Sequence, residues 1–172
     1  MTSSYWLDEV WKRPARLRTG GAVDVSVIGG GVTGCACALA LAEAGRRVRL
    51  YEAREVAGGA SGRNGGFALR GAAPAYEEAR EQLGAEAVRA LWRLTERYLD
   101  RLAKLAGDAF RRTGSLRLAA DPDERAELTR EHLALREDGF AVECRDQLPE
   151  PLAGRFDGAI FHPGDGSIQP AR

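Results

Sequence analysis

The sequence predicts an α/β fold that begins with a parallel βαβ unit. An apolar, β-branched run at residues 23–28 is followed by three glycines and by a small, apolar stretch at residues 35–44. A second strand-like run at residues 47–52 then ends in an acid. Apolar β-branched runs are typical of buried strands, and parallel strands need a crossover such as a helix between them. These three observations favour a Rossmann-type unit.

The glycine turn has the spacing of a phosphate-binding turn at the start of a helix. Its sequence is Gly29-Gly-Gly31-Val-Thr-Gly34. In this pattern Gly29 permits the tight turn, Gly31 leaves room for a pyrophosphate, and Gly34 lets the helix pack closely on the strand. Gly45 stands where a helix C-cap is expected. A turn that binds nothing is the alternative, and the complete strand, turn, helix, strand and acid order argues against it.

Glu52 follows Gly34 by 18 residues, close to the spacing at which a carboxylate binds the adenosine ribose hydroxyls. Taken alone, Glu52 would be read as a solvated acid at a strand end. Its place in the motif assigns it to the ribose instead. A carboxylate at this point repels a ribose 2′-phosphate, so NADP is disfavoured while NAD and FAD remain.

A second glycine-rich segment follows at residues 58–67, with the sequence Gly-Gly-Ala-Ser-Gly-Arg-Asn-Gly-Gly-Phe. A flexible surface loop is the simplest interpretation. Backbone amides without side-chain obstruction, together with the Ser61 hydroxyl, offer a second one, because they can reach a pyrophosphate or a flavin.

The two glycine segments with the acid between them resemble the FAD-dependent oxidoreductases related to D-amino-acid oxidase, glycine oxidase and sarcosine oxidase. The branch that oxidises gamma-glutamylputrescine is the most similar. Residues 4–8, 112–119 and 158–171 extend the resemblance over nearly all of the chain. Members of this family are more than twice as long, so the chain is similar to their N-terminal part. We therefore expect an incomplete site that needs a companion chain for the missing C-terminal half.

The resemblance implies a Rossmann-type FAD-binding βαβ domain and the start of an inserted α+β substrate domain. It also implies oxidation of an amine or amino acid at a C–N bond, with hydride transfer to the flavin and reoxidation of the flavin by oxygen or another acceptor. The implied cofactor residues lie in two groups. The ADP-binding group is Gly29, Gly31, Gly34 and Glu52, and the loop beside the pyrophosphate and flavin supplies Ser61, Arg63, Asn64, Gly65 and Gly66. A local ion pair within the loop is the alternative for Arg63. No catalytic residue is implied.

Two other functions stay open. A NAD-dependent dehydrogenase would share the glycine turn and the acid, but it has no need for the loop at residues 58–66. A non-catalytic nucleotide-binding fragment, or one subunit of a split oxidase, would bind nucleotide without turnover. Bound flavin is yellow and NAD is not, so the colour of the purified protein distinguishes a flavoprotein from a NAD-dependent dehydrogenase.

Composition argues against several classes of partner. Lys plus Arg is 25 and Asp plus Glu is 25, which leaves no net field to attract nucleic acid. No apolar run approaches the roughly 20 residues of a membrane span, and the first residues lack the pattern of a signal peptide, so we expect a cytoplasmic protein with a small-molecule substrate. We expect no metal site, because Cys35 and Cys37 point to different faces of a helix and the remaining cysteine and both histidines are isolated. The two cysteines are expected to fill space between helix and sheet.

The remaining elements follow from periodicity and from helix boundary signals. Helices are predicted at residues 74–82 and 85–106, and a third runs from an Asp121 cap to residue 138. Strands are predicted at 110–119, with a bend at Gly114, and at 140–144. Residues 147–154 should be loop, and the family resemblance implies a hairpin and turn at 158–171. The expected domains are an N-terminal extension at 1–22, an FAD-binding part at 23–110 and the start of a substrate domain at 111–172.

Overall fold

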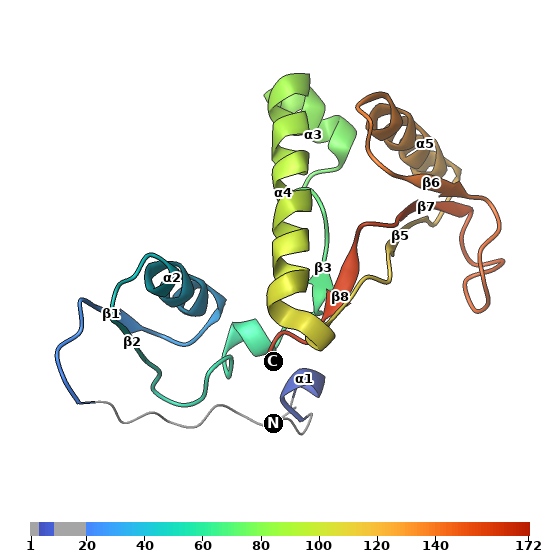
Figure 1. The fold of residues 1–172 in the computed structure, drawn as a ribbon. Coiled ribbons are helices and arrows are strands. Elements are labelled where there is room, and N and C mark those ends of the chain that lie inside the picture. Colours follow the sequence, from blue (N-terminus) through green and yellow to red (C-terminus); the bar gives the residue numbers. More distant parts are fainter. Residues whose placement is uncertain (1–3, 9–19) are drawn as a thin grey trace. The chain divides into compact units, whose positions relative to one another are not determined.

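The computed structural model describes residues 4–8 and 20–172, which form two compact units (Figure 1). The first unit contains the described residues up to Gly66 together with Gln169–Arg172, and the second is Phe67–Ile168. Part of the predicted N-terminal extension lies outside the described residues. The compact units divide at residue 66, whereas the sequence predicts a change of domain at residue 110. The domain assignment therefore stays a prediction.

The first unit holds the predicted βαβ arrangement. Strands β1 (Val25–Ile28) and β2 (Val48–Tyr51) pair in parallel, from Val25 opposite Val48 to Ile28 opposite Tyr51. Helix α2 (Val32–Glu43) connects them. Two short elements complete the unit, the helix α1 (Tyr5–Asp8) and the 3-10 turn η1 (Ala60–Gly62). The strand, helix and strand predicted between residues 23 and 52 are confirmed.

Helix α2 differs from its prediction at two points. It begins at Val32 rather than at residue 35, because Gly31 has extended backbone and serves as the N-cap. The expectation that both cysteines fill space between helix and sheet is wrong for Cys37, which is exposed, while Cys35 is half-buried. Residues two apart on a helix differ by about 200° in direction, so only one of the two can face the sheet.

The second unit contains three helices and six short strands among its described residues. The helices are α3 (Tyr76–Leu83), α4 (Ala85–Ala106) and α5 (Pro122–Glu137), with a 3-10 turn η2 (Gly107–Ala109). The strands are β3 (Phe67–Ala68), β4 (Phe110–Arg111), β5 (Ser115–Ala119), β6 (Glu143–Arg145), β7 (Gly158–His162) and β8 (Gly166–Ile168). They form two antiparallel sheets with the orders β3-β8-β4 and β5-β7-β6.

The strand expected at residues 110–119 is interrupted more completely than predicted. Gly114 (φ +72°) separates β4 from β5, and these strands belong to different sheets. The Gly114 amide donates to the Asp165 carbonyl oxygen, and a Cβ at Gly114 would lie 2.2 Å from the Phe161 ring. Close packing against β7 thus turns the predicted bend into a break.

The hairpin expected at residues 158–171 is wrong. Strand β7 lies at the centre of one sheet and β8 at the centre of the other, so the two do not pair with each other. Asp165, between them, is buried, and its carboxylate accepts hydrogen bonds from the Arg70 amide (2.9 Å) and the Ser115 hydroxyl (2.7 Å). The connection is itself a tight turn, closed by a hydrogen bond from the Asp165 amide to the His162 carbonyl oxygen at 3.3 Å, but the chain leaves this turn into the other sheet. The strand predicted at 140–144 is shifted to β6, because Phe140 enters the core.

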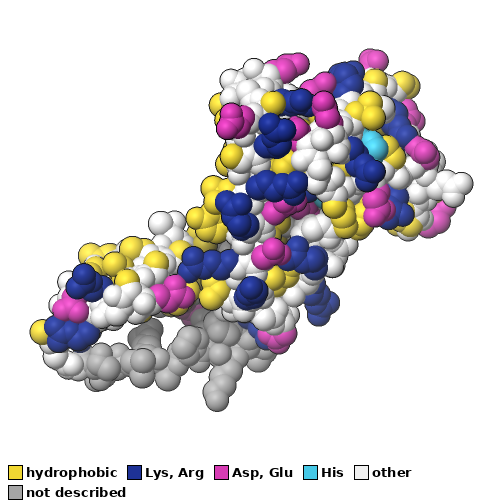
Figure 2. Space-filling view, turned by 45° about the horizontal axis from the view of Figure 1, so that its top comes forward, with side chains coloured by type: hydrophobic (Ala, Val, Ile, Leu, Met, Phe, Trp, Pro, Cys, Tyr) yellow, Lys and Arg dark blue, Asp and Glu magenta, His cyan; other side chains and the backbone are white. Residues whose placement is uncertain are grey.

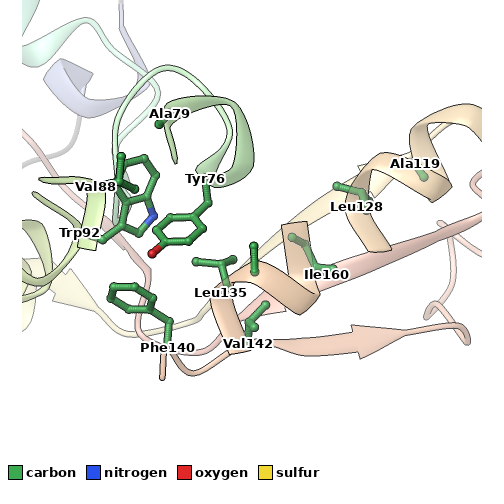
Figure 3. Close-up of a cluster of buried hydrophobic side chains, with 11 residues drawn as sticks. Tyr76, Ala79, Val88, Trp92, Ala119, Leu128, Leu135, Phe140, Val142 and Ile160 are labelled. Carbon is green, nitrogen blue, oxygen red and sulfur yellow. The ribbon is translucent and has the colours of Figure 1, made fainter. Parts of the chain in front are cut away.

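Buried hydrophobic side chains of α3, α4, α5, β5 and β7 make the core of the second unit (Figure 3). Tyr76 lies at its centre, and the rings of Trp92 and Phe140 meet it edge to face at centroid distances of 5.0 and 5.4 Å. The Tyr76 hydroxyl donates to Asp138 at 2.6 Å, and burial together with this carboxylate raises the pKa of Tyr76. The core is therefore fixed by a polar anchor as well as by packing.

The helix boundaries of the second unit agree well with the prediction. Asp121 caps α5, and its side chain accepts a hydrogen bond from the Glu124 amide at 2.8 Å. Helix α4 has the predicted bounds, and it buries Val88, Trp92 and Leu99. A second, smaller cluster joins α4 to the β3-β8-β4 sheet.

A polar cluster connects the segment after β3 to α4 and β7. The side chain of Arg70 is 5% exposed and donates to Glu96 at 2.9 Å and to His162 Nδ1 at 2.9 Å. Because arginine only donates, His162 Nδ1 is the acceptor and the neutral imidazole carries its proton on Nε2. Burial, and then the neighbouring Arg70 charge, lower the pKa of His162 to about 4.

Candidate functional site

The glycine turn connects β1 to α2 by backbone conformations that suit glycine. Gly29 has φ +101°, and its amide donates to the Tyr51 carbonyl oxygen at 2.8 Å. Gly31 then caps the helix with extended backbone. The first four amides of a helix have no acceptor within it, so the turn ends in a group of donors at the positive end of the helix dipole.

Gly34 lies where helix and strand approach most closely. A Cβ at this position would lie 1.9 Å from the Gly29 carbonyl oxygen, a distance that no real Cβ tolerates. Since the obstacle is backbone, no side-chain rotation would relieve it. Residue 34 must therefore be glycine for α2 to start where it does.

The Glu52 carboxylate fixes the turn from the end of β2. One oxygen accepts the Arg54 amide at 2.9 Å and the other accepts the Gly30 amide at 2.7 Å. These two backbone bonds, first that of Arg54, lower the pKa of Glu52. Each carboxylate oxygen has a second lone pair, so the group can still accept hydrogen bonds from a diol such as a ribose.

Ser61 brings the second glycine segment to the N-terminus of α2. Its Oγ accepts the Val32 amide at 2.9 Å, and a Cβ at Gly31 would lie 3.1 Å from this oxygen. Because Oγ is used as an acceptor, the hydroxyl proton remains free to be donated to an anion. Gly31, Ser61 and the first turn of α2 thus form one donor-rich site that lacks bulky side chains.

The side chains of Arg63 and Asn64 shape their own loop. Arg63 Nε donates to the Gly58 carbonyl oxygen at 3.1 Å, a backbone contact in place of the ion pair considered as its alternative. Asn64 Nδ2 donates to the Ser61 carbonyl oxygen at 2.7 Å, and its Oδ1 accepts the Gly66 amide at 2.8 Å. Gly66 has φ +69°, which suits glycine. These side-chain contacts fix the backbone of residues 63–66.

The sequence pattern missed two glycines that shape the site. Gly30 is buried, and its Cβ would lie 3.1 Å from that of Glu52. Gly62, the last residue of η1, is buried, and a Cβ there would lie 2.4 Å from the Ala57 carbonyl oxygen. Gly30 occupies an unconstrained position of the glycine motif, so the motif gave it no role. The sequence pattern also gave no sign of the hydrogen bonds that Ser4, Trp6 and Gln169 make, because these join residues far apart in the chain.

The donor set fits the adenosine diphosphate half of a dinucleotide. Backbone amides and the Ser61 hydroxyl suit a pyrophosphate, and the Glu52 carboxylate suits a ribose. The obstruction that a Cβ at Gly31 would cause lies on the side where the donors meet. Among residues 4–8 and 20–172, no group of three metal-ligating side chains comes together.

Comparisons with known proteins show the family of the chain. The model of the family described as "DAO: FAD dependent oxidoreductase" matches residues 24–172. A gamma-glutamylputrescine oxidoreductase of Escherichia coli is 30% identical over 155 residues, which cover 86% of this chain and 36% of that protein. A probable oxidoreductase, OrdL, of Haemophilus influenzae is 40% identical over 77 residues, 45% of this chain and 18% of that protein.

Solved structures show the same fold. Glycine oxidase from Geobacillus kaustophilus has a TM-score of 0.62 and 26% identity, over 87% of this chain and 41% of that chain. L-amino acid deaminase from Proteus vulgaris has a TM-score of 0.64 and 18% identity, over 94% of this chain and 38% of that chain. The chain thus spans about two fifths of these structures.

Proposed function

The chain belongs to the DAO family of FAD-dependent oxidoreductases, and from this premise we propose that it forms the cofactor-binding part of an enzyme that oxidises an amine or an amino acid. FAD is the cofactor of this family. Relatives named for gamma-glutamylputrescine, glycine and L-amino acids support the substrate class. The observation that carries the proposal is the meeting of Ser61 with the N-terminus of α2 beside Gly31.

The residues of the first unit would bind FAD in three places. The amides of the first turn of α2 would bind the pyrophosphate. Gly29 and Gly31 precede this turn and Gly34 lies within it. Glu52 would accept hydrogen bonds from the ribose hydroxyls. Ser61 would donate its proton to a phosphate oxygen, and the backbone of residues 63–66 would approach the flavin ring.

When bound, FAD supplies an acceptor for the hydride that leaves the carbon beside the substrate nitrogen, which converts the amine to an imine. The described residues contribute binding and orientation. Gly30 and Arg54 hold the Glu52 carboxylate in one place, so the ribose meets a preorganised acceptor. The Asn64 side chain holds the turn at Gly66, which keeps the loop backbone open to the ring.

Titration of the purified chain with FAD and with NAD tests the cofactor. We expect FAD to bind and Gly31→Val to abolish binding, because the added side chain would occupy the space beside Ser61. Gly59→Val is the matched control, since a Cβ there meets no atom within 4 Å. Tight binding of NAD with none of FAD would contradict the proposal and favour the dehydrogenase alternative.

The exposed apolar surface of the first unit supports a companion segment. Among the described residues its sheet has two strands, α2 has no buried residue, and Ile28 and Val32 are 88% and 71% exposed. A helix that is apolar on all sides is normally covered. We propose that further strands and a substrate site come from such a segment, so that these 172 residues alone bind FAD without turnover.

Activity measurements test this proposal directly. The chain would be incubated with FAD and a panel of amines and amino acids that includes gamma-glutamylputrescine. Flavin bleaching would be followed in the absence of oxygen, and peroxide release in the presence of oxygen as the acceptor. Both signals should stay at background. Robust turnover by the chain alone would refute the need for a companion and would place a substrate site among residues that we interpret as structural.

The charge distribution supports a small-molecule substrate over a nucleic acid. Figure 2 shows Lys and Arg side chains interspersed with Asp and Glu on the face that it draws, in agreement with the formal net charge of zero. No helix in the described ranges has both the length and the apolar character needed to cross a membrane. A cytoplasmic location remains a prediction of the sequence.

A further inference from the structure

A short segment near the start of the chain clasps the glycine-rich loop from one side. We call residues 4–8, which include α1, the N-terminal strap. The Ser4 hydroxyl donates to the Gly62 carbonyl oxygen at 2.7 Å, and the Trp6 indole nitrogen donates to the Asn64 carbonyl oxygen at 2.8 Å. The Leu7 side chain fills the space above Gly62, where a Cβ would lie 2.9 Å from Leu7 Cδ2. Both hydrogen bonds join residues 58 positions apart in the sequence.

The other end of the chain secures the strap. Gln169 is buried, and its Nε2 donates to the Trp6 carbonyl oxygen at 2.8 Å. Its Oε1 accepts the Ala171 amide at 2.6 Å, which fixes the orientation of the side chain. Figure 1 shows the C-terminus beside α1. The strap is therefore bound on two sides, although α1 is too short to be stable by itself.

The strap determines which way the loop's peptide groups point. In a trans peptide the carbonyl oxygen and the following amide point in opposite directions. Since the Asn64 carbonyl points to Trp6, the Gly65 amide points away from the strap. The Arg63 and Gly66 amides are already bound, to the Ala60 carbonyl oxygen and to Asn64 Oδ1. For the Gly65 amide the structure gives no acceptor among residues 4–8 and 20–172.

We propose that the N-terminal strap positions the loop for the cofactor, with Ser4 and Trp6 as positioning residues that aim the Gly65 amide at bound FAD. This inference rests on the proposed function. The face of the loop that points away from the strap is then the face that contacts the cofactor. Gly65 has no side chain to cover its amide, so an approaching acceptor meets the donor unobstructed.

Matched substitutions in the 172-residue chain test the proposal. Trp6→Phe removes the indole donor and keeps an aromatic ring, and Ser4→Ala removes the hydroxyl. Tyr5→Phe is the control for Trp6, because Tyr5 lies in the same helix, is 78% exposed and keeps its edge-to-face ring contact. Ser4→Thr, which retains a hydroxyl, should restore the behaviour of the original protein.

Two readouts separate loop order from cofactor binding. Trypsin cleavage after Arg63 reports local opening of the cofactor-free loop, and cleavage after Arg155 in the second unit serves as the internal standard. The dissociation constant and the visible circular dichroism of FAD report the bound state. Loss of one hydrogen bond should accelerate cleavage at Arg63 by about threefold to tenfold and raise the dissociation constant by a similar factor.

Each outcome decides the proposal. Faster cleavage at Arg63, weaker FAD binding and altered circular dichroism in Trp6→Phe and Ser4→Ala, with both controls unchanged, would support it. Unchanged cleavage would overturn it, and so would faster cleavage with unchanged FAD binding, because the strap would then order the loop without serving the cofactor. Failure of the unsubstituted chain to bind FAD would refute the proposed function, while Arg63 cleavage would still show whether the strap orders the loop.

Discussion

Replacement of Gly34 by alanine should uncouple α2 from β1 and thereby damage the dinucleotide site. The new Cβ would lie 1.9 Å from the Gly29 carbonyl oxygen and 3.1 Å from its carbonyl carbon. Real Cβ atoms keep at least 3.0 Å from such neighbours, so helix and turn must separate by about an ångström. That displacement falls on the first turn of α2, where the pyrophosphate amides lie.

The expected magnitude follows from two opposing effects. Forcing an extra methyl group into a tight contact costs about 1–3 kcal/mol. The higher helix propensity of alanine offsets about 1 kcal/mol of this. The first unit should therefore lose up to about 2 kcal/mol of stability, whereas affinity for FAD should fall at least about tenfold, because near-ångström errors in donor placement weaken several hydrogen bonds at once.

Calorimetric titration with FAD and amide hydrogen exchange of residues 25–52 measure these two effects. Gly59→Ala is the matched control, since its Cβ meets no atom within 4 Å and its φ is −90°. The control should keep the original affinity. If Gly34→Ala bound FAD as tightly as the control and kept its hydrogen-exchange protection, the close approach of α2 to β1 would be irrelevant to the site.

Three further predictions concern single side chains. Glu52→Gln should raise the FAD dissociation constant about tenfold in calorimetry, because its NH₂ group would face a backbone donor; unchanged affinity would show that Glu52 is only a surface acid. Tyr76→Phe should lower the urea-unfolding free energy of the second unit by about 1–2 kcal/mol, through loss of the bond to Asp138, with FAD affinity as the unaffected control. Because the pKa of His162 is lowered in the folded state, the unfolded chain binds more protons between pH 6.5 and about 4. The unfolding free energy of the second unit should therefore decrease as the pH is lowered through this window, by at most about 1.4 kcal/mol per pH unit. His162→Gln, which keeps an acceptor for Arg70, should flatten that dependence, and an unchanged slope would assign it to other groups.

The βαβ unit was predictable because its determinants are local. The tight turn, the close helix contact and the acid each depend on residue type at a fixed spacing, and Gly29, Gly34 and Glu52 occupy those positions. The Asp121 cap and the bounds of α4 were predictable for the same reason. Each of these features depends on residues at a fixed and short separation along the chain.

The features that sequence did not predict depend on distant partners. Strand β8 pairs with β3 and β4 instead of with β7, and Asp165 beside it binds the backbone of Arg70 and the hydroxyl of Ser115, residues that are remote in the sequence. The strap contacts of Trp6 likewise join it to Asn64 and Gln169, which are 58 and 163 positions away in the sequence. Periodicity identifies which face of an element is apolar, but it does not identify the distant group that a buried carboxylate or an indole nitrogen will meet.

The two units are stabilised by different interactions, which bears on how cofactor binding and order are connected. Both clusters of buried hydrophobic side chains lie in the second unit. The glycine turn and loop of the first unit are instead held by hydrogen bonds to Glu52, Ser61 and Asn64, each of which is close to solvent. Solvent-accessible hydrogen bonds contribute little net stability, so segments that depend on them open readily. A ligand that binds only the closed arrangement adds stability by mass action, about 2.7 kcal/mol at a hundredfold excess over its dissociation constant. In the proposed complex, FAD would therefore supply much of the order of the turn and loop that bind it.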